Sequence, residues 1–533
     1  MATPGRGALR EPDPLARCAR TSSFNGAGAL PRLLIVLLAA ACIGSDVVPH
    51  VQAVKRTIRV RGPVVDLKVD CGARGDGTSN DTGAFQKAAR MLQETGGGTL
   101  RIEAGIYIVG RQGHDEGAYP YYRREPIFAV RDVNGLLIEG AEGAVIRLAD
   151  GLHYGSFDKN RGEPIEPNMP FLDRDCHVSA AVMFDIARSR NVILRNLELD
   201  GNRGRLVLGG QWGDTGWQLA AGGIHLFGCR DVLVENVRTH HHGQDGIMIG
   251  FAGLKESDPP TPHVLLNVIS EYNGRQGLSW VGGRGLTAVR CRFNHTQRDG
   301  FGSAPGAGVD IEAEDSICRD GLLVGCEFVN NGGCGLAADT GDGGYSRFED
   351  CLFWGTTNWA MWNTRPGMVF ENCRFYGSVV HSYGSAERPE LATRYKGCHF
   401  EDVEHPQYGV YRSYLLINHD NARPNVLFED CDIVANRLKA LWFACGEAPG
   451  IILRHCRITH RHGGLDDGDF QSLLRGVVLD NVRFKEDLSD TARDYCIIAQ
   501  DVSVEGDTHI DGPRVRWQRA RSGPTGTLPD RRY

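Results

Sequence analysis

The sequence predicts an all-β fold in which short parallel strands wind into a solenoid, a parallel β-helix. An alternating strand interrupted by a polar kink recurs along most of the chain. A second alternating strand, led by glycine, lies between successive copies. Helical patterns are nearly absent from this region. Repeated strands at solenoid-like spacing, without helices between them, are typical of a β-helix.

The kinked strand is the clearest repeat. Each copy reads as a strand, a polar residue that is often Asn or Asp, a Cys or aliphatic residue, and a second short strand. Successive copies begin roughly 22–40 residues apart, within the range of solenoid repeats. The copies are VILRNLELD (192–200), VLVENVRTH (232–240), VLLNVISEYN (264–273), LTAVRCRFN (286–294), LLVGCEFVN (322–330), SRFEDCLFW (346–354), MVFENCRFY (368–376), TRYKGCHFE (393–401), VLFEDCDIV (426–434), IILRHCRIT (451–459) and VVLDNVRF (477–484).

The Gly-led strands supply the third side of each coil. They include DGIMIGF (245–251), QGLSWVGG (276–283), AGVDIEAE (307–314) and CGLAADT (334–340). Three short strands per turn with Gly or Asn bends describe a parallel β-helix. A β-propeller, the alternative, needs antiparallel four-stranded blades and a longer, more regular period.

Cysteine recurs at one place in the kinked strand. Stacked coils would put these residues in an interior column, with neighbours about 4.8 Å apart. We expect buried thiols that pack as small hydrophobic side chains. No Cys-x-x-Cys pair supports metal binding by them. The column comprises Cys291, Cys326, Cys351, Cys373, Cys398, Cys431 and Cys456.

One segment near the front predicts a helix. SNDTGAFQKAARMLQETGGG (79–98) has Asn80 or Asp81 as its N-cap, apolar residues at helical spacing and a glycine stop. We expect this amphipathic helix to cover the open apolar end of the solenoid. The preceding GARGDGT (72–78) lacks the Gly-Lys-Ser/Thr ending of a phosphate-binding loop, so a plain loop is expected.

The stretch VDLKVDCGARGDGTSNDTGAFQKAARMLQETGGGTLRIEAGIYIV (65–109) resembles the opening segment of the pectate-lyase-like superfamily. That superfamily includes rhamnogalacturonases, polygalacturonases, polysaccharide epimerases and phage tailspikes. With the repeats, the resemblance covers roughly residues 60–500 and implies a right-handed parallel β-helix and a glycan substrate. It does not fix the reaction, because this fold hosts hydrolases, lyases, epimerases and non-catalytic glycan-binding proteins.

Domain boundaries follow from these patterns. Residues 1–53 are predicted to be a signal peptide or leader, because five arginines precede the apolar run LLIVLLAAACI (33–43), which is short for a bilayer span. We expect cleavage after Ala53 and a secreted, periplasmic or cell-surface protein. The remainder divides into an N-terminal cap at 54–100, a β-helix at 101–502 with inserted loops at about 111–126, 150–180 and 203–222, and a disordered tail at 503–533.

Composition limits the partners. The 533-residue chain has a formal net charge of −7 and no long basic run in its folded part, which argues against nucleic acid. Beyond the leader, no membrane-spanning segment is expected. The expected partner is a polysaccharide or oligosaccharide, and the sequence does not fix the oligomeric state.

The candidate catalytic centre is the strand GAGVDIEAED (306–315). Its alternation places Asp310, Glu312 and Glu314 on one face and apolar residues on the other. Asp310 and Glu312 would have Cα atoms about 6.6 Å apart, and neighbouring coils would add further groups at about 5 Å and about 10 Å. Such spacings suit either an inverting or a retaining glycosidase. The predicted catalytic set is Asp310, Glu312, Asp245, Asp339, His242 and Arg275.

Other reactions use almost the same residues. The polygalacturonase motifs do not carry over, because GQDG (243–246) matches only the Asp of their Asn-Thr-Asp motif and the next coil, GRQG (274–277), has no Asp pair. Elimination or C5-epimerisation of a uronate needs a base and a positive charge, often Ca²⁺ held by carboxylates. Hydrolysis requires no cofactor. No metal site is assigned, but Asp310, Glu312 and Asp339 could hold Ca²⁺ in a lyase. A non-catalytic glycan-binding or structural solenoid is a further alternative.

Substrate contacts are expected from bends and insertions beside the acidic strand. Aromatic rings stack on the apolar faces of sugars, whereas Trp280 has inward parity and is expected in the core. The predicted substrate-binding set is Arg298, Asn273, His295, Trp212, Trp217, Tyr121 and Tyr122.

Overall fold

The structure is a computed structural model, and its second compact unit, Ser45–Tyr533, holds all of the described residues. It describes residues 47–165, 174–210, 219–356, 359–377, 380–409, 415–420, 424–436, 439–444, 450–461, 472–487, 497–511, 515–518 and 521–522. The expected leader therefore lies outside the described residues up to position 46. Helix α1 (Val47–Thr57) crosses the expected cleavage point. In the described part of the chain, no helix has the length and apolar character needed to cross a bilayer.

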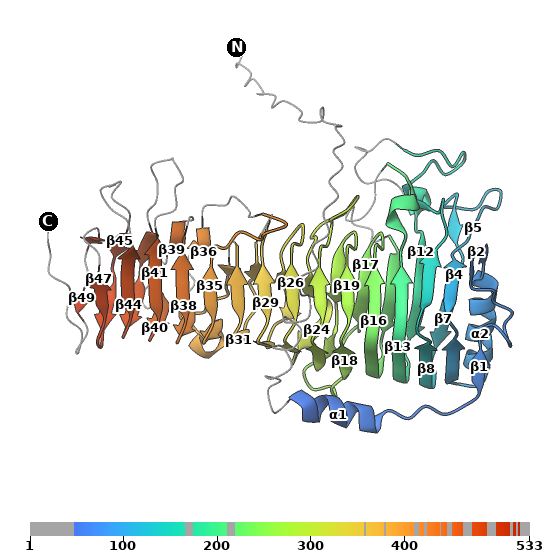
Figure 1. Ribbon diagram of the computed structural model, residues 1–533, viewed down its shortest axis with the longest axis horizontal. Coiled ribbons are helices and arrows are strands. Elements are labelled where there is room, and N and C mark those ends of the chain that lie inside the picture. The colour runs from blue at the N-terminus through green and yellow to red at the C-terminus, as the bar shows by residue number, and fades with distance from the viewer. Residues whose placement is uncertain are drawn as a thin grey trace, which may run out of the picture. The chain divides into compact units, whose positions relative to one another are not determined.

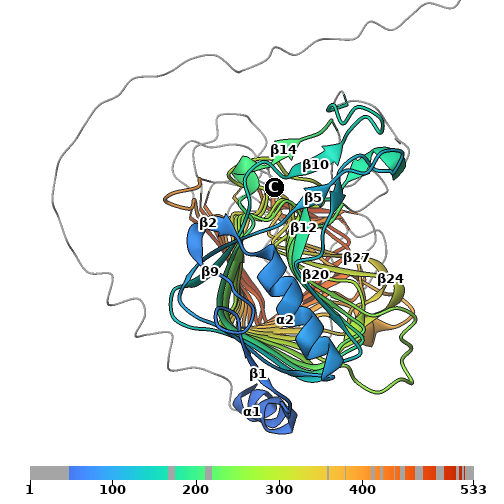
Figure 2. The same cartoon turned by 90° about the vertical axis from the view of Figure 1, so that its right-hand side faces the viewer.

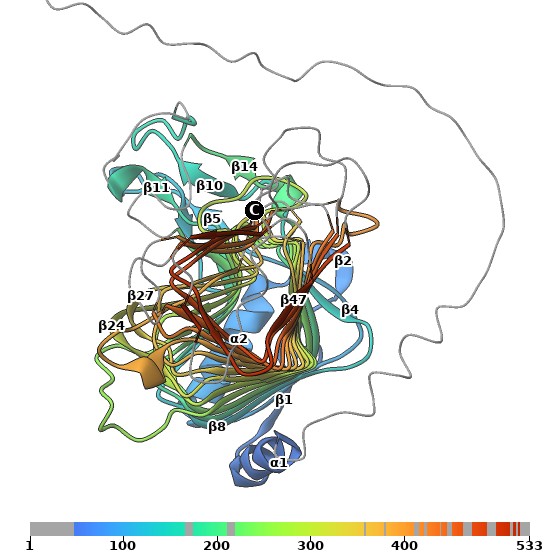
Figure 3. The same ribbon diagram turned by 90° about the vertical axis from the view of Figure 1, so that its left-hand side faces the viewer.

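The chain winds into coils of three strands, and the strands of successive coils pair in parallel (Figure 1). One coil contains β20, β22 and β23, and the next contains β24, β25 and β26, which pair with them in that order. The predicted three-strand coil is confirmed. The antiparallel blades of a propeller are excluded, because the long ladders are parallel throughout. Seen from the C-terminal end, the strands of successive coils lie behind one another (Figure 3).

Three ladders result, which we call ladders 1, 2 and 3. Ladder 1 contains β7 (Phe128–Arg131), β12 (Ala181–Ala187), β15 (Ala221–Phe227), β17 (Asp245–Gly250), β20 (Gln276–Trp280), β24 (Val309–Arg319), β27 (Leu336–Gly343), β30 (Met361–Asn363), β33 (Val380–His381), β36 (Leu415–Asp420), β39 (Lys439–Ala444), β42 (Ser472–Arg475), β45 (Ile497–Gln500) and β48 (Val515–Gln518). Strand β21 (Gly283–Arg284) pairs with β24 beside it.

Ladders 2 and 3 share the long strands β13 (Arg190–Asp200) and β16 (Arg230–His240). Ladder 2 also contains β1 (Val64–Asp66), β3 (Gly98–Ile102), β8 (Asn134–Gly140), β18 (His263–Leu266), β22 (Leu286–Val289), β25 (Leu322–Val324), β28 (Arg347–Glu349), β31 (Val369–Glu371), β34 (Arg394–Lys396), β37 (Leu427–Glu429), β40 (Ile451–Arg454), β43 (Val477–Asp480), β46 (Ser503–Glu505) and β49 (Arg521–Ser522). Ladder 3 also contains β2 (Asp76–Asn80), β4 (Gly105–Val109), β9 (Ala144–Leu148), β19 (Ile269–Glu271), β23 (Arg292–Asn294), β26 (Glu327–Val329), β29 (Leu352–Trp354), β32 (Arg374–Tyr376), β35 (His399–Glu401), β38 (Asp432–Ala435), β41 (Arg457–Arg461), β44 (Arg483–Asp487) and β47 (His509–Asp511).

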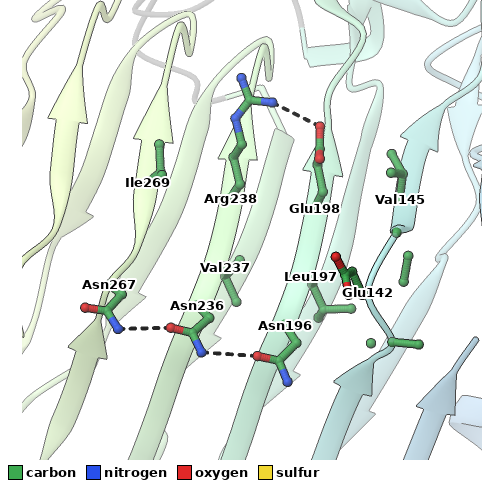
Figure 4. A pocket seen from close by; sticks show the side chains of 14 residues that line it. Glu142, Val145, Asn196, Leu197, Glu198, Asn236, Val237, Arg238, Asn267 and Ile269 are labelled. Carbon is green, nitrogen blue, oxygen red and sulfur yellow. Dashed lines mark hydrogen bonds and ion pairs between the residues drawn. The ribbon is translucent and has the colours of Figure 1, made fainter. Parts of the chain in front are cut away.

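A left-handed residue marks the predicted polar kink between ladders 2 and 3. Asn196, Asn236 and Asn267 have φ angles of 57°, 53° and 53°. Asn, Asp and Gly tolerate this conformation best, which explains the composition of the kink. The amide of Asn236 donates to Asn196 Oδ1 at 3.2 Å, and Asn267 donates to Asn236 Oδ1 at 3.0 Å (Figure 4). Positive φ angles recur at the kinks of later coils, at Arg290, Gly325, Asp350, Asn372, Gly397, Asp430, His455 and Asn481.

The interior is apolar, and the predicted cysteine column lies within it. All seven of its cysteines are buried and unbridged. Each thiol donates to carbonyls nearby, as Cys351 Sγ does to Leu323 O at 3.4 Å. Stacked rings run beside the column; Phe328 and Phe353 have centroids 4.5 Å apart. The expected role as small hydrophobic side chains is confirmed.

Helix α2 (Thr82–Glu94) lies across the N-terminal end of the stack (Figure 2). It packs on β1, β3 and β7, and its fully buried Phe85 and Leu92 join the main core. The carboxylate of Asp81, just before the helix, accepts the backbone N–H groups of Arg74 at 2.8 Å and Gly75 at 3.0 Å. The predicted loop at 72–78 is thereby tied to the helix start. The capping role of α2 stays a prediction.

The insertions and the tail complete the fold. Strands β5 (Gln112–Gly113) and β6 (Arg123–Arg124) form a hairpin in the first insertion. The second and third insertions are joined by a small three-stranded sheet, which contains β10 (His153–Ser156), β11 (His177–Val178) and β14 (Val207–Leu208).

The prediction of a disordered tail is wrong for its described part. Strands β46–β49 continue the ladders there, because their alternating apolar residues extend the same core. Residues 523–533 lie outside the described range.

Candidate functional site

A column of outward side chains crosses the coils of ladder 1. The strand register aligns Asp185, His225, Met248, Ser279, Asp310, Ala337, Trp362 and His381, one from each successive strand from β12 to β33. Their neighbours in the strands, such as Val309 and Ile311, belong to the core. The period of two therefore sets which residues can meet a ligand.

Asp310 lies at the centre of this column. Its side chain lies on the outward face of β24, as predicted. Asp310 is nevertheless only 3% exposed, so its carboxyl group is largely removed from solvent. The side-chain amide of Gln276, one coil earlier, donates a hydrogen bond to Asp310 Oδ2. Burial, followed by the negative charges of Glu312 and Asp339, raises the pKa of Asp310 well above its usual range. Asp310 therefore keeps its proton where an exposed aspartate has lost it.

Glu312 and Asp339 complete the acidic cluster with Asp310. Glu312 follows Asp310 on β24 and is half-buried, whereas Asp339 on β27 is exposed. The register between these strands shifts: Ile311 pairs with Ala338, but Glu312 pairs with Thr340. Asp339 is the extra residue in this shift, and its Oδ1 accepts the hydroxyl of Thr340 at 3.0 Å. The structure thus brings together three of the predicted catalytic residues.

Two more predicted residues form a buried ion pair. Arg275 Nε lies 2.9 Å from Asp245 Oδ1, and Nη2 lies 2.5 Å from Oδ2. Asp245 is fully buried. Its charge, with those of Glu312 and Asp310, raises the pKa of Arg275 despite desolvation. The prediction that Asp245 transfers protons is wrong, because both of its oxygens are held by a permanent cation. The pair instead positions a guanidinium beside the acidic cluster.

Three buried polar atoms on the strands that precede β24 in ladder 1 have no hydrogen-bond partner within the described part of the chain. They are His225 Nε2, Gln276 Oε1 and Ser279 Oγ, all on ladder 1. An unsatisfied buried polar group costs about 1–3 kcal/mol, so such groups commonly serve a bound ligand. Burial and the charges of Arg124 and Arg275 lower the pKa of His225 to about 3, and the imidazole is neutral.

Sequence reasoning missed His225, Gln276 and Asp185. The signal was present, since AVMFDIA (181–187) and GGIHLFG (222–228) each place one polar residue between inward apolar residues. Aligning these strands with β24 would have put Asp185 and His225 in the column of Asp310.

Two predicted site residues are turned into the interior, contrary to expectation. His242 and Asn273 are fully buried, so neither can contact a polysaccharide. His242 Nε2 lies 2.9 Å from Thr239 Oγ1. Asn273 accepts the backbone N–H of His242 at 3.1 Å and donates to Ser270 Oγ at 3.0 Å. Both side chains satisfy polar groups at the bend before ladder 1, which strand parity does not reveal.

The predicted binding residues His295 and Arg298 lie in the bend after β23, and both side chains contact other residues of the protein. His295 is 8% exposed and stacks on Tyr272, with ring centroids 4.6 Å apart. Arg298 Nε donates to Asn330 O at 3.1 Å. The third insertion fixes the backbone of this bend. Its buried Arg203 donates hydrogen bonds to Asp299 O and Phe301 O, each at 2.7 Å.

The predicted aromatic residues have different surroundings in the structure. Tyr121 stacks on His114 and Tyr122 on His153, each with centroids 3.6 Å apart, so one face of each ring is covered. Trp212 and Trp217 lie outside the described residues. Trp280 is 1% exposed within the core, as expected. A further aromatic group lies on ladder 1, where Trp362 stacks on His381 at 3.9 Å and contacts Trp359 at 4.4 Å.

A surface pocket of 540 Å³ lies elsewhere, over the kinks of ladders 2 and 3 (Figure 4). It is lined by the Asn196–Asn236–Asn267 ladder and by the ion pair between Arg238 Nη1 and Glu198 Oε1, 3.0 Å apart. Its amides bond one another along the stack, so this pocket reflects the packing of the kinks. It contains none of the ladder 1 site residues.

These observations define a parallel β-helix. Residues 174–375 match the family described as "Right handed beta helix region", which confirms the predicted right-handed fold. No curated protein matches the sequence.

Several solved structures are similar in fold. The A-module of mannuronan C-5 epimerase AlgE4 from Azotobacter vinelandii is 15% identical, with a TM-score of 0.38 over 88% of this chain and 100% of the module. The family 28 exopolygalacturonase of Yersinia enterocolitica is 11% identical, with a TM-score of 0.32 over 88% of this chain and 79% of that enzyme. These similarities assign no reaction to this chain.

Proposed function

We propose that this protein is a polysaccharide-active enzyme in which Asp310 acts as the acid. The observation that carries the proposal is a buried carboxyl group with a raised pKa, in the same ladder as three buried polar atoms that lack a hydrogen-bond partner among the described residues. A general acid needs its proton near neutral pH, and burial among negative charges supplies that condition. Sugar hydroxyls are donors and acceptors that could satisfy His225 Nε2, Gln276 Oε1 and Ser279 Oγ.

Hydrolysis of a glycosidic bond is the first candidate. Asp310 donates its proton to the leaving glycosidic oxygen as the bond from that oxygen to the anomeric carbon breaks. Glu312 or Asp339 accepts a proton from the water that attacks the same carbon, or attacks it directly. Strand geometry separates the Cα atoms of Asp310 and Glu312 by about 6.6 Å, and the anomer of the product distinguishes the two routes.

The substrate we propose is an acidic, pectin-like or uronate-containing glycan. Arg275 and Arg124 lie near the column and contribute positive charge, since both lower the pKa of His225. The Trp362–His381 stack lies two and three strands beyond Asp310 in the same column. Two strand spacings are about 10 Å, so a chain running along the stack could place one sugar at Asp310 and another on the Trp362 ring.

Elimination or C5-epimerisation of a uronate is the second candidate. It is supported by the neutral imidazole of His225, whose Nε2 has no partner among the described residues and which lies near two arginine charges. In that reaction a base removes the proton beside the uronate carboxylate, and cations stabilise the charge that develops. Asp310, Glu312 and Asp339 would hold Ca²⁺ if the enzyme is such a lyase. A non-catalytic glycan-binding solenoid remains the third candidate, and export of the protein stays a prediction.

The test is incubation with a panel of pectic and uronate glycans. New reducing ends without the ultraviolet absorbance of an unsaturated uronate indicate hydrolysis, and reducing ends with it indicate elimination. A change in the NMR signals of the uronate without cleavage indicates epimerisation. Addition of Ca²⁺ or a chelator tests the metal requirement. Binding without any of these changes supports the non-catalytic alternative and overturns the proposal.

Asp310→Asn is the decisive variant. It keeps the shape and neutrality of the protonated side chain and should lower turnover by about 10²–10⁴-fold, the usual contribution of a positioned acid. Glu314→Gln is the matched control, since Glu314 lies on the same strand but is exposed. It should leave turnover unchanged. An active Asp310→Asn variant would assign the column to binding alone.

A further inference from the structure

Two histidines and an aspartate lie close together at the C-terminal ends of β13 and β16. None of them belongs to the ladder 1 site. Asp200 ends β13, His240 ends β16, and His241 follows in the left-handed conformation with φ of 54°. One ligand atom from each residue lies within 4.8 Å of the other two. The parallel register of β13 and β16 pairs Asp200 directly with His240. The arrangement is therefore fixed by strand pairing and by one bend.

Each imidazole is oriented by a carboxylate on its Nε2 atom. Glu198 Oε1 lies 3.1 Å from His240 Nε2. Asp299 Oδ2 lies 3.3 Å from His241 Nε2. A carboxylate acceptor at Nε2 favours the tautomer in which Nε2 carries the proton and Nδ1 carries the lone pair. This is the carboxylate–histidine arrangement that commonly supports a metal ligand.

The two Nδ1 atoms consequently face each other at 2.7 Å. Two lone pairs at that separation repel, so this contact requires either a proton on one Nδ1, which makes it a hydrogen bond between the imidazoles, or a metal ion between the two atoms. The Oδ1 atom of Asp200 lies 3.8 Å from His240 Nδ1 and adds an anionic oxygen to the same point.

The surroundings hold the ligands and leave one side open. The His241 ring stacks on Tyr272, with an interplanar angle of 7°. Asp200 accepts the backbone N–H of Asn202 at 2.8 Å. The His240 side chain is 7% exposed, but those of Asp200 and His241 are 21% and 28% exposed, so water could complete the coordination.

We propose that Asp200, His240 and His241 bind a divalent transition-metal ion such as Zn²⁺, with a position left for water or another ligand. Imidazole and carboxylate ligands suit Zn²⁺, whereas Ca²⁺ prefers oxygen ligands alone. Two imidazole nitrogens on one tetrahedral Zn²⁺, each at about 2.0–2.1 Å, are about 3.3 Å apart. Occupation thus requires the rings to open by only about 0.6 Å.

Nearby cations oppose the ion and set a clear expectation. Arg147 Nε lies 3.4 Å from Asp200 Oδ2 and competes for that carboxylate. Arg238 Nη1 lies 3.0 Å from Glu198 Oε1, the same oxygen that orients His240. The histidines should therefore contribute more to affinity than Asp200. His240→Gln and His241→Gln should each abolish binding at this site, while Asp200→Asn should weaken it.

The experiment is a Zn²⁺ titration of the full chain, without a histidine tag, by isothermal calorimetry. The wild type should bind one more equivalent than His241→Gln, and Ca²⁺ should not displace it. Co²⁺ should give the intense visible bands of a low-coordinate site in the wild type and in His455→Gln, but not in His240→Gln or His241→Gln. Glu198→Gln, which retains both ligands, should weaken binding by about 10–100-fold. His455→Gln is the control, because His455 is exposed and paired with Asp430 at 3.6 Å.

Folding of each variant is checked by circular dichroism and by its thermal midpoint without metal. Equal Zn²⁺ stoichiometry in the wild type and in both folded variants, His240→Gln and His241→Gln, overturns the proposal. A Co²⁺ spectrum that is the same in the wild type and in these two variants also overturns it. A stoichiometry that falls equally in His455→Gln also overturns it, because surface histidines would then account for the binding.

Discussion

Arg275 and Asp245, on consecutive coils, form a two-pronged ion pair that is almost completely removed from solvent. Their side chains are 4% and 0% exposed, and the two N···O distances are 2.9 and 2.5 Å. The charges of Glu312 and Asp310 also act on Arg275, so the charge balance of the pair affects both stability and the site.

Removal of one partner should destabilise the fold strongly. Asp245→Asn leaves the Arg275 charge buried without its anion, and the free energy of unfolding should fall by about 3–5 kcal/mol. Asp132→Asn is the control, because the pair between Asp132 and Arg188 is exposed to solvent and its loss should change stability much less. Urea unfolding of both variants measures the difference. Similar losses would show that the Arg275–Asp245 pair is not desolvated as described.

Asp310 should make stability and activity fall as the pH rises. Its native pKa is raised, so the native state binds more protons than the unfolded state between the unfolded pKa, about 3.9, and the native value. Its contribution is fully present below about pH 4 and is lost as the pH rises through the native pKa. Relative to Asp310→Asn, the wild type should therefore lose stability with increasing pH. A difference that does not change from pH 4 to pH 9 would contradict a raised pKa. If Asp310 is the acid, turnover should decline over the upper part of the same range.

Trp362 should matter for long substrates. Trp362→Ala removes the ring that stacks on His381, and KM for a polymer should rise roughly 5- to 30-fold, equivalent to about 1–2 kcal/mol of binding. The kcat for a short oligosaccharide should change little. Tyr376→Ala, on ladder 3, controls for the loss of an aromatic ring elsewhere. An unchanged KM for polymers would remove the Trp362 ring from the proposed substrate path.

The kink at Asn236 gives a test of backbone conformation. Asn236→Ala and Asn236→Gly both remove the amide ladder, but only alanine places a Cβ at φ of 53°. The alanine variant should be less stable than the glycine variant by about 1 kcal/mol, the lower end of the left-handed penalty. Denaturant midpoints measure the comparison. Equal midpoints would mean that the left-handed conformation is not strained at this position.

Helix α2 should protect the first coil if it acts as a cap. Phe85→Ala empties a fully buried position and should cost about 3–5 kcal/mol. Amide hydrogen exchange should then accelerate first in β1 and β3, on which the helix packs. Arg90→Ala, on the exposed side of the helix, should stay within about 0.5 kcal/mol of the wild type. Uniform acceleration along all coils would contradict a capping role.

Much of the fold could be predicted because the repeat itself carries the information. The kink residues, the inward cysteines and the alternation around Asp310 all follow from local backbone preference and a period of two. The strands of the tail are hard to predict because Arg and Pro are frequent in the residues around them, although VRWQ (515–518) alternates.

Less of the site could be predicted. Parity placed Asp310 outward, but its burial depends on side chains from neighbouring coils, such as Gln276. Bends have no simple period, so the inward turn of His242 and Asn273 was not visible in the sequence. Predicting the ion pair of Asp245 requires the register between coils, which places Arg275 at the matching position at the start of the next coil. Long-range register, more than residue type, separates the correct assignments from the wrong ones.

The position of β24 within the stack has a consequence for robustness. The strands of each coil pair only with strands of the coils beside it, so we expect fraying to begin at the two ends and to advance one coil at a time. Strand β24 has several paired strands of ladder 1 on either side. Loss of a terminal coil would therefore leave the Asp310 neighbourhood intact, and truncations that shorten the protein from its C-terminal end should erode its heat tolerance long before they erase its chemistry.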